Sequence, residues 1–70
     1  MGEDMRTRLE LIRAERGLTQ TELAEKAGLS RNVIWRIERS HGAIRLATLG
    51  RLAMALDVDL ADLAEDVEIA

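Results

Sequence analysis

The chain has 70 residues, no cysteine and a formal net charge of −3 at pH 7. This length suits a single domain spanning residues 1–70, and the lack of cysteine excludes a disulfide or a thiolate zinc site as a brace. The composition is 47% hydrophobic without Phe or Tyr, which favours closely packed short helices over a sheet. No apolar run approaches the roughly 20 residues that span a bilayer, and no signal peptide is visible. We therefore expect a cytoplasmic protein without a membrane partner.

Charge is distributed unevenly along the chain. Residues 57–70 hold six acidic side chains and no Lys or Arg, so seven acids stand against ten bases in residues 1–56. Such a dipolar molecule is able to approach a polyanion with one side only. For any polyanionic partner the net acidity predicts weak non-specific binding, so that specific contacts or dimerisation would have to supply more of the affinity.

The first half of the chain predicts three helices. Apolar residues at helical spacing indicate a helix from Met5 to Arg16, ended by Gly17. Residues 18–39 then have the pattern of two short helices joined by a tight turn. Thr19 and Glu22 form a capping box at the start of the first of these helices, and Gly28 supplies the left-handed residue that ends it. Ser30 is a good N-cap for the second helix.

The second of these helices has two distinct sides. Val33, Ile34 and Ile37 point toward the core, at about 100° per residue. The opposite side holds Asn32, Trp35, Arg36 and Arg39, with Arg31 at its edge. Arg and Asn side chains bind guanine and adenine edges bidentately, and both also bind phosphate. A solvated helix face usually mixes charge signs, whereas Glu38 lies only at the margin of this one. The pattern therefore favours a contact face.

Two further helices are expected after a connection that contains glycine. Leu46–Leu56 has leucines on one face, and Asp59 is placed to cap a last short helix. In that helix Leu60, Leu63, Ala64 and Val67 follow the i, i+3, i+4, i+7 pattern. Five short helices around one core, at about residues 5–67, make an all-α domain.

These motifs together resemble the Cro/repressor-type (xenobiotic-response-element) helix-turn-helix regulators. The resemblance covers about residues 6–64 and places the helix-turn-helix at about residues 19–39, in the second and third helices. The matching residues are Gly17-Leu18-Thr19-Gln20, Glu22-Leu23-Ala24, Ala27-Gly28-Leu29-Ser30, Ile34, Ile37-Glu38-Arg39, Leu46, Thr48-Leu49, Leu52-Ala53, Ala55-Leu56 and residues 58–63.

The resemblance implies roles for individual residues. Positions that face bases in the major groove are matched by Arg31, Asn32, Val33 and Arg36. Gln20 matches a position that binds phosphate and braces the recognition helix. Positions that tend to touch the DNA backbone are matched by Ser30, Arg39 and His41.

Three features depart from the family pattern. Ser40 replaces the usual glycine, and the loop that follows lacks the common proline and basic residues, so fewer phosphate contacts are expected. Trp35 stands where a small or polar residue is usual. Its indole either lies along the sugar-phosphate backbone, covers the core at Ile44, or marks a protein contact.

These observations predict a sequence-specific DNA-binding transcriptional regulator. We expect a repressor that binds a pseudo-palindromic operator as a homodimer. The expected dimer surface comprises Val58, Leu60, Leu63 and Val67, although the same residues also suit the core. The alternative is a protein-interaction module of the same fold, such as an antitoxin, with a protein partner and weak or no DNA reading. With one His and no Cys, Tyr or glycine-rich phosphate loop, the sequence predicts no enzyme, cofactor, metal or small-molecule ligand.

Overall fold

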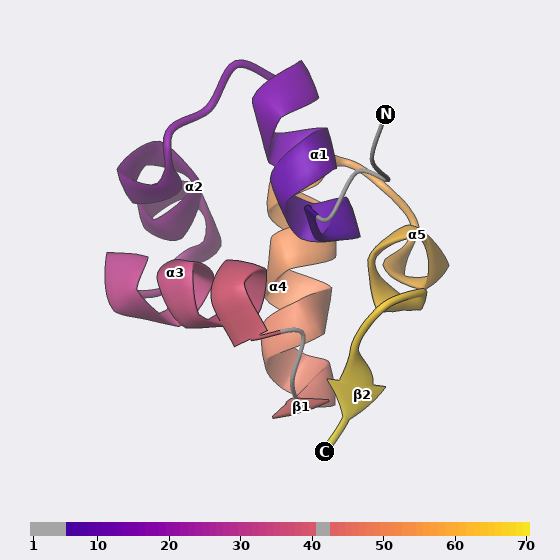
Figure 1. The fold of residues 1–70 in the computed structure, drawn as a ribbon. Helices are drawn as coiled ribbons and strands as arrows, with labels where there is room; N and C mark the ends of the chain where they lie inside the picture. The colour runs from indigo at the N-terminus through magenta and orange to yellow at the C-terminus, as the bar shows by residue number, and fades with distance from the viewer. Residues whose placement is uncertain (1–5, 41–42) are drawn as a thin grey trace, which may run out of the picture.

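The computed structural model describes residues 6–40 and 43–70 and is built almost entirely of short helices (Figure 1). The helix α4 lies at the centre, and the other four helices surround it (Figure 1). The all-α, five-helix prediction is confirmed, with a two-stranded sheet as a minor addition. The elements are α1 (Arg8–Glu15), α2 (Gln20–Ala27), α3 (Arg31–Ser40), β1 (Ala43–Ile44), α4 (Leu46–Leu56), α5 (Leu60–Ala64) and β2 (Glu68–Ile69).

The ends of α1 and α2 follow local capping chemistry. The Thr7 side chain accepts a hydrogen bond from the backbone N–H of Glu10, so α1 begins at Arg8. The periodicity had predicted an earlier start, at Met5. In α2 the capping box between Thr19 and Glu22 is present in both directions, at 2.8 and 3.0 Å. Gly28 ends α2 with φ of 71°, the left-handed conformation in which glycine has no steric penalty.

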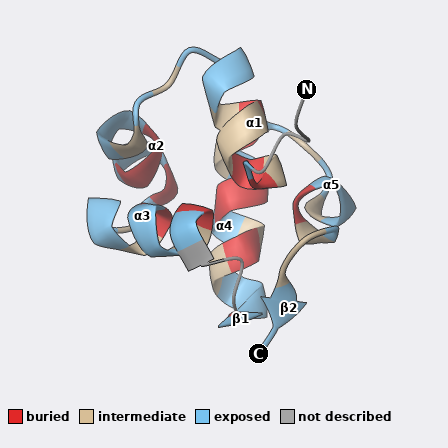
Figure 2. Ribbon diagram, in the orientation of Figure 1, coloured by how far each residue is buried: buried red, intermediate tan, exposed pale blue. Residues whose placement is uncertain are grey.

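The core is aliphatic and has α4 at its middle. Every helix contributes buried apolar side chains, and these residues form one continuous cluster beneath the exposed outer faces (Figure 2). The buried hydrophobic residues are Leu9, Ile12, Leu23, Ala24, Ala27, Ile34, Ile44, Leu49, Leu52, Ala53, Leu56 and Leu63. A core without Phe or Tyr therefore still encloses fully buried positions on α2, α3, α4 and α5.

The C-terminal end differs from the sequence prediction. The last helix stops at Ala64, so Val67 lies outside it, and Asp59 occupies the N-cap position without a side-chain capping bond. The chain then forms β2, which pairs in parallel with β1 through Ala43–Glu68 and Ile44–Ile69. The periodicity could not anticipate this pairing, because two-residue strands carry no recognisable alternation and their partners are 25 residues apart in the chain.

The tail is also attached to the start of α1. The carboxylate of Asp66 accepts the backbone N–H of Arg8 at 2.8 Å, and Glu65 forms an ion pair with the Arg8 guanidinium at 3.2 Å. Both contacts place negative charge at the N-terminal end of α1, where the helix dipole favours it. The acidic C-terminal end therefore has a structural use beyond being a solvated surface.

Leu63 must be removed from the expected dimer surface. Its side chain is 1% exposed, because α5 packs against α4 and Leu63 belongs to the core cluster. Val58, Leu60 and Val67 are only partly buried and remain accessible at the surface.

None of the helices formed by the described residues is long and apolar enough to cross a membrane.

Truncation of Leu52 tests the central position of α4. Leu52 is 0% exposed, and we expect Leu52→Ala to lower the free energy of unfolding by about 2–5 kcal/mol through lost burial and a residual cavity. Met54 on the same helix is 84% exposed, so Met54→Ala should change it by less than about 0.5 kcal/mol. Urea unfolding followed by circular dichroism measures both. Equal losses would contradict the packing described here.

Candidate nucleic-acid interface

The outward side of α3 is the candidate contact surface. Ile34 is fully buried and anchors the helix to the core, while Val33 and Ile37 are half-buried on either side of it. The predicted outward residues are all exposed, which confirms the helical periodicity used to find them. They are Arg31, Asn32, Trp35, Arg36 and Arg39. Their contact with DNA stays a prediction.

The sequence pattern placed Glu38 at the margin of this surface, and the structure shows that this was wrong. Glu38 is 7% exposed and faces inward, because it follows Ile34 by four residues and so shares the buried side of α3. The outward face defined by Arg31, Asn32, Trp35, Arg36 and Arg39 therefore contains three cations and no acid. The face is therefore more uniformly basic than the sequence indicated.

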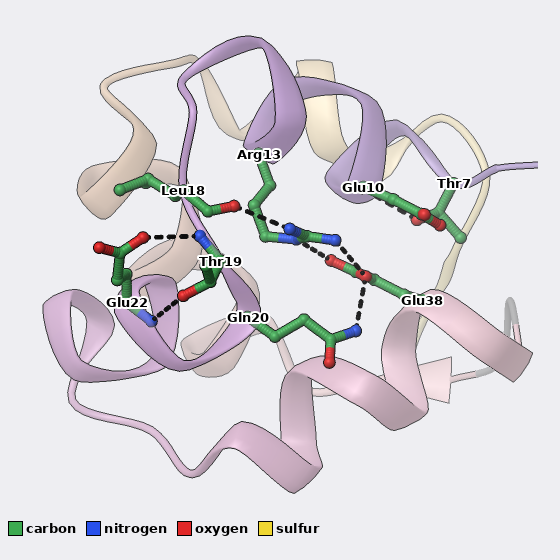
Figure 3. A network of polar contacts seen from close by, with 8 residues as sticks. All are labelled: Thr7, Glu10, Arg13, Leu18, Thr19, Gln20, Glu22 and Glu38. Atoms are coloured by element: carbon green, nitrogen blue, oxygen red, sulfur yellow. Dashed lines mark hydrogen bonds and ion pairs between the residues drawn. The ribbon is translucent and has the colours of Figure 1, made fainter.

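Glu38 is held by a network that joins α1, α2 and α3 (Figure 3). Its Oε2 pairs with Arg13 Nε at 2.7 Å, and its Oε1 accepts from Arg13 Nη2 at 3.0 Å. Gln20 Nε2, at the start of α2, donates to the same Oε1 at 2.9 Å. Arg13 Nη1 also donates to the Leu18 carbonyl oxygen at 2.8 Å, which ties the network to the α1–α2 connection.

The network holds α3 in place by bidentate, charge-assisted bonds. The hydrogen bonds that Arg13 donates to the Glu38 carboxylate raise the pKa of the Arg13 guanidinium, because the paired carboxylate favours the charged form. Since a raised pKa means that stability is lost only as the pH rises through the folded-state value, this contribution persists at neutral pH and disappears in strong alkali. The tether of Arg13 to α3 was not predicted from the sequence, because no local pattern pairs residues 25 positions apart.

Trp35 and Arg39 form a pair on the exposed side of α3. The guanidinium carbon of Arg39 lies 5.2 Å from the centroid of the indole ring, within the range of a cation–π interaction. Trp35 is 41% exposed. A ring that covered the core would be largely buried, so its exposure favours the other two interpretations, a place beside the DNA backbone or a protein contact.

The remaining predicted backbone contacts lie near the two ends of α3. Ser30 is exposed and lies just before the first turn of α3. The Ser30 Oγ accepts a hydrogen bond from the Val33 N–H at 3.4 Å, which is long for a capping bond. Gln20 is half-buried at the start of α2 and reaches the same helix through Glu38. His41 lies outside the described residues.

The arrangement of α2, the turn at Gly28 and the outward-facing α3 defines a helix-turn-helix domain of the Cro/repressor type. The chain belongs to the helix-turn-helix family, whose model matches residues 9–63. This family consists of DNA-binding regulators, and the match extends from α1 into α5. The fold-class prediction and the family resemblance are both confirmed.

Two relatives illustrate this membership. The chain is 47% identical over 53 residues to the immunity repressor protein of Bacillus phage phi105, which is 76% of this chain but only 37% of that protein. It is also similar to the crystal structure of the restriction-modification controller protein C.AhdI from Aeromonas hydrophila. That comparison has a TM-score of 0.76 and 36% identity, and covers 80% of this chain and 85% of that one.

The Glu38 network generates a stability prediction. Glu38→Gln keeps the shape of the side chain but leaves the Arg13 charge without its carboxylate, so we expect a loss of roughly 3 kcal/mol in the free energy of unfolding. Glu25→Gln on the exposed side of α2 removes the same charge and should cost less than about 0.5 kcal/mol. Urea unfolding at neutral pH compares the two. A Glu38 variant as stable as the Glu25 variant would show that the network does not hold α3.

Proposed function

We propose that this protein is a sequence-specific transcriptional repressor that inserts α3 into the major groove of DNA. The exposed face of α3 carries this proposal, because it presents three arginines and Asn32. The one acidic residue of the helix, Glu38, is buried on the opposite side. Such a face supplies both phosphate attraction and bidentate donors for base edges. The names of the two relatives, an immunity repressor and a controller protein, support a regulatory use.

The residues of the motif divide into two proposed groups. Base edges would be read from the first two turns of α3, by Arg31, Asn32, Val33 and Arg36. The phosphate side would comprise Gln20, Ser30, Arg39 and His41, and Trp35 lies on this side of α3 in contact with Arg39. Phosphate contacts set the register of the helix, whereas base contacts determine the sequence that is read.

Gln20 is suited to two tasks at once. One N–H of its amide donates to Glu38 at 2.9 Å, and the second N–H of the same nitrogen is left to donate to a phosphate oxygen. A phosphate bound there would be tied through Glu38 to both α3 and Arg13. Gln20 would then set the position of the recognition helix relative to the DNA backbone.

A single recognition helix reads few base pairs, so the proposal includes a symmetric homodimer on a pseudo-palindromic operator. Half-sites in such complexes lie about 34 Å apart, one helical turn of DNA. Val58, Leu60 and Val67 are the proposed dimer contacts, because they are apolar and only partly buried around α5. The proposal includes no catalytic step, cofactor or small-molecule ligand.

A protein-interaction module of the same fold, such as an antitoxin, is the second candidate. It is favoured by the exposed indole of Trp35 on α3 and by the net charge of −3, which weakens attraction to DNA. The two functions are compatible in one protein, since a partner that covered α3 would compete with DNA.

The proposed function is tested by selecting bound duplexes from a random DNA pool at near-physiological salt. We expect enrichment of a two-fold symmetric motif whose half-site spacing reports the geometry of the dimer. A pool that remains random, with the protein shown to be folded by circular dichroism, would overturn DNA reading and direct attention to a protein partner.

Arg36 provides the residue-level test. We expect Arg36→Ala to weaken binding to the selected site by about 1–3 kcal/mol and to relax specificity at one base pair. Arg51→Ala removes the same charge from α4, outside the recognition helix, and should affect all sequences alike. Fluorescence anisotropy with the selected duplex and single-base variants measures both. An equal loss on every duplex would show that Arg36 contacts phosphate and does not read a base.

A further inference from the structure

We infer that Trp35 is a positioning residue for Arg39, and that its indole holds the guanidinium ready for one DNA phosphate. This inference rests on the proposed DNA-binding function and assigns separate tasks to the two side chains. Arg39 touches the phosphate, and Trp35 acts through Arg39 without a contact of its own.

The geometry of α3 brings the two side chains together. Residues four apart lie on the same side of a helix, one turn from each other. The 5.2 Å separation between the Arg39 guanidinium carbon and the indole centroid lies within the roughly 6 Å reach of a cation–π contact, and Trp is the ring that makes it best. Both side chains are exposed on the face that carries Asn32 and Arg36.

The cation–π contact leaves hydrogen-bond donors of the guanidinium available. The guanidinium carbon of Arg39 lies over the indole ring, and the group carries five N–H donors, more than a contact with one ring engages. The acid beside it in sequence, Glu38, is already bonded to Arg13 and Gln20 on the opposite side of the helix. Arg39 is therefore directed by an aromatic ring, which holds the cation without neutralising it.

A held arginine binds phosphate with a smaller entropic loss. A free Arg side chain has many rotamers, and binding normally immobilises it at a cost in affinity. The stacked arrangement imposes part of that order before DNA arrives. In a chain with net charge −3, in which general attraction to DNA is weak, a pre-ordered cation is worth more than a mobile one.

The first experiment is a double-mutant cycle on DNA affinity. We expect Trp35→Leu to weaken binding roughly two- to fivefold on selected and scrambled duplexes alike, and Trp35→Phe to restore part of that loss. Arg39→Ala should lower the slope of log affinity against log salt by about 0.9, the value for one phosphate contact. In the Arg39→Ala background, Trp35→Leu should have no further effect.

The second experiment needs no DNA. Trp35 is the only tryptophan of a chain without Tyr or Phe, so its emission reports on this position alone. We expect Arg39→Ala to increase quenching of the emission by acrylamide, because the guanidinium no longer covers the ring. Arg36→Ala removes a charge from the same helix and should leave the quenching unchanged. Circular dichroism of each variant confirms that helix content is retained.

The outcomes separate the two proposals. If the wild-type protein binds DNA but Trp35→Leu costs the same with and without Arg39, the indole contacts DNA directly and this inference is wrong. Unchanged quenching in Arg39→Ala overturns the stacked geometry whatever the DNA results are. If the wild-type protein binds no duplex at low salt, the DNA-binding function fails and this inference fails with it.

Discussion

The orientation of the recognition helix depends on the buried contact between Glu38 and Arg13. One carboxylate receives two bonds from the α1 guanidinium and one from the α2 amide of Gln20, so three helices meet at a single side chain of α3. Apolar packing of Ile34 holds α3 against the core but is non-directional. The charged network is directional, because bidentate bonds restrict how the helix can rotate or slide. The exposed face is presented in one orientation for this reason.

The two sides of α3 have opposite electrostatic character as a result. Its single acid is buried and paired, whereas its three arginines lie outside with Asn32 and Trp35. A protein of net charge −3 thereby offers a basic surface, and the excess acid is kept in the C-terminal end. Part of that acid is used within the fold, since Asp66 and Glu65 bind Arg8 at the start of α1. Separation of charge within the molecule is thus compatible with a compact domain.

Features that depend on residues close together in the chain could be predicted from the sequence, whereas features that depend on distant segments could not. The helices of the motif, the capping box at Thr19 and the left-handed turn at Gly28 were predictable, because each depends on residues within about one helical turn. The exposed face of α3 followed from periodicity. The sequence left Leu63 open between the core and a dimer surface, and its burial was decided by the fold. The end of α5 at Ala64 and the pairing of β1 with β2 were not predicted, since each depends on segments distant in the chain.

The sequence by itself determined the helical class, the family and the residues of the candidate contact face, because local spacing and capping specify them. Only the tertiary structure decided what Glu38, Arg13 and Trp35 do. Glu38 and Arg13 are 25 residues apart and meet because α1 and α3 pack together, which no local pattern encodes. Trp35 and Arg39 have helical spacing, but that spacing also suits side chains that point apart. The structure shows that they point together, with the Arg39 guanidinium carbon 5.2 Å from the indole centroid.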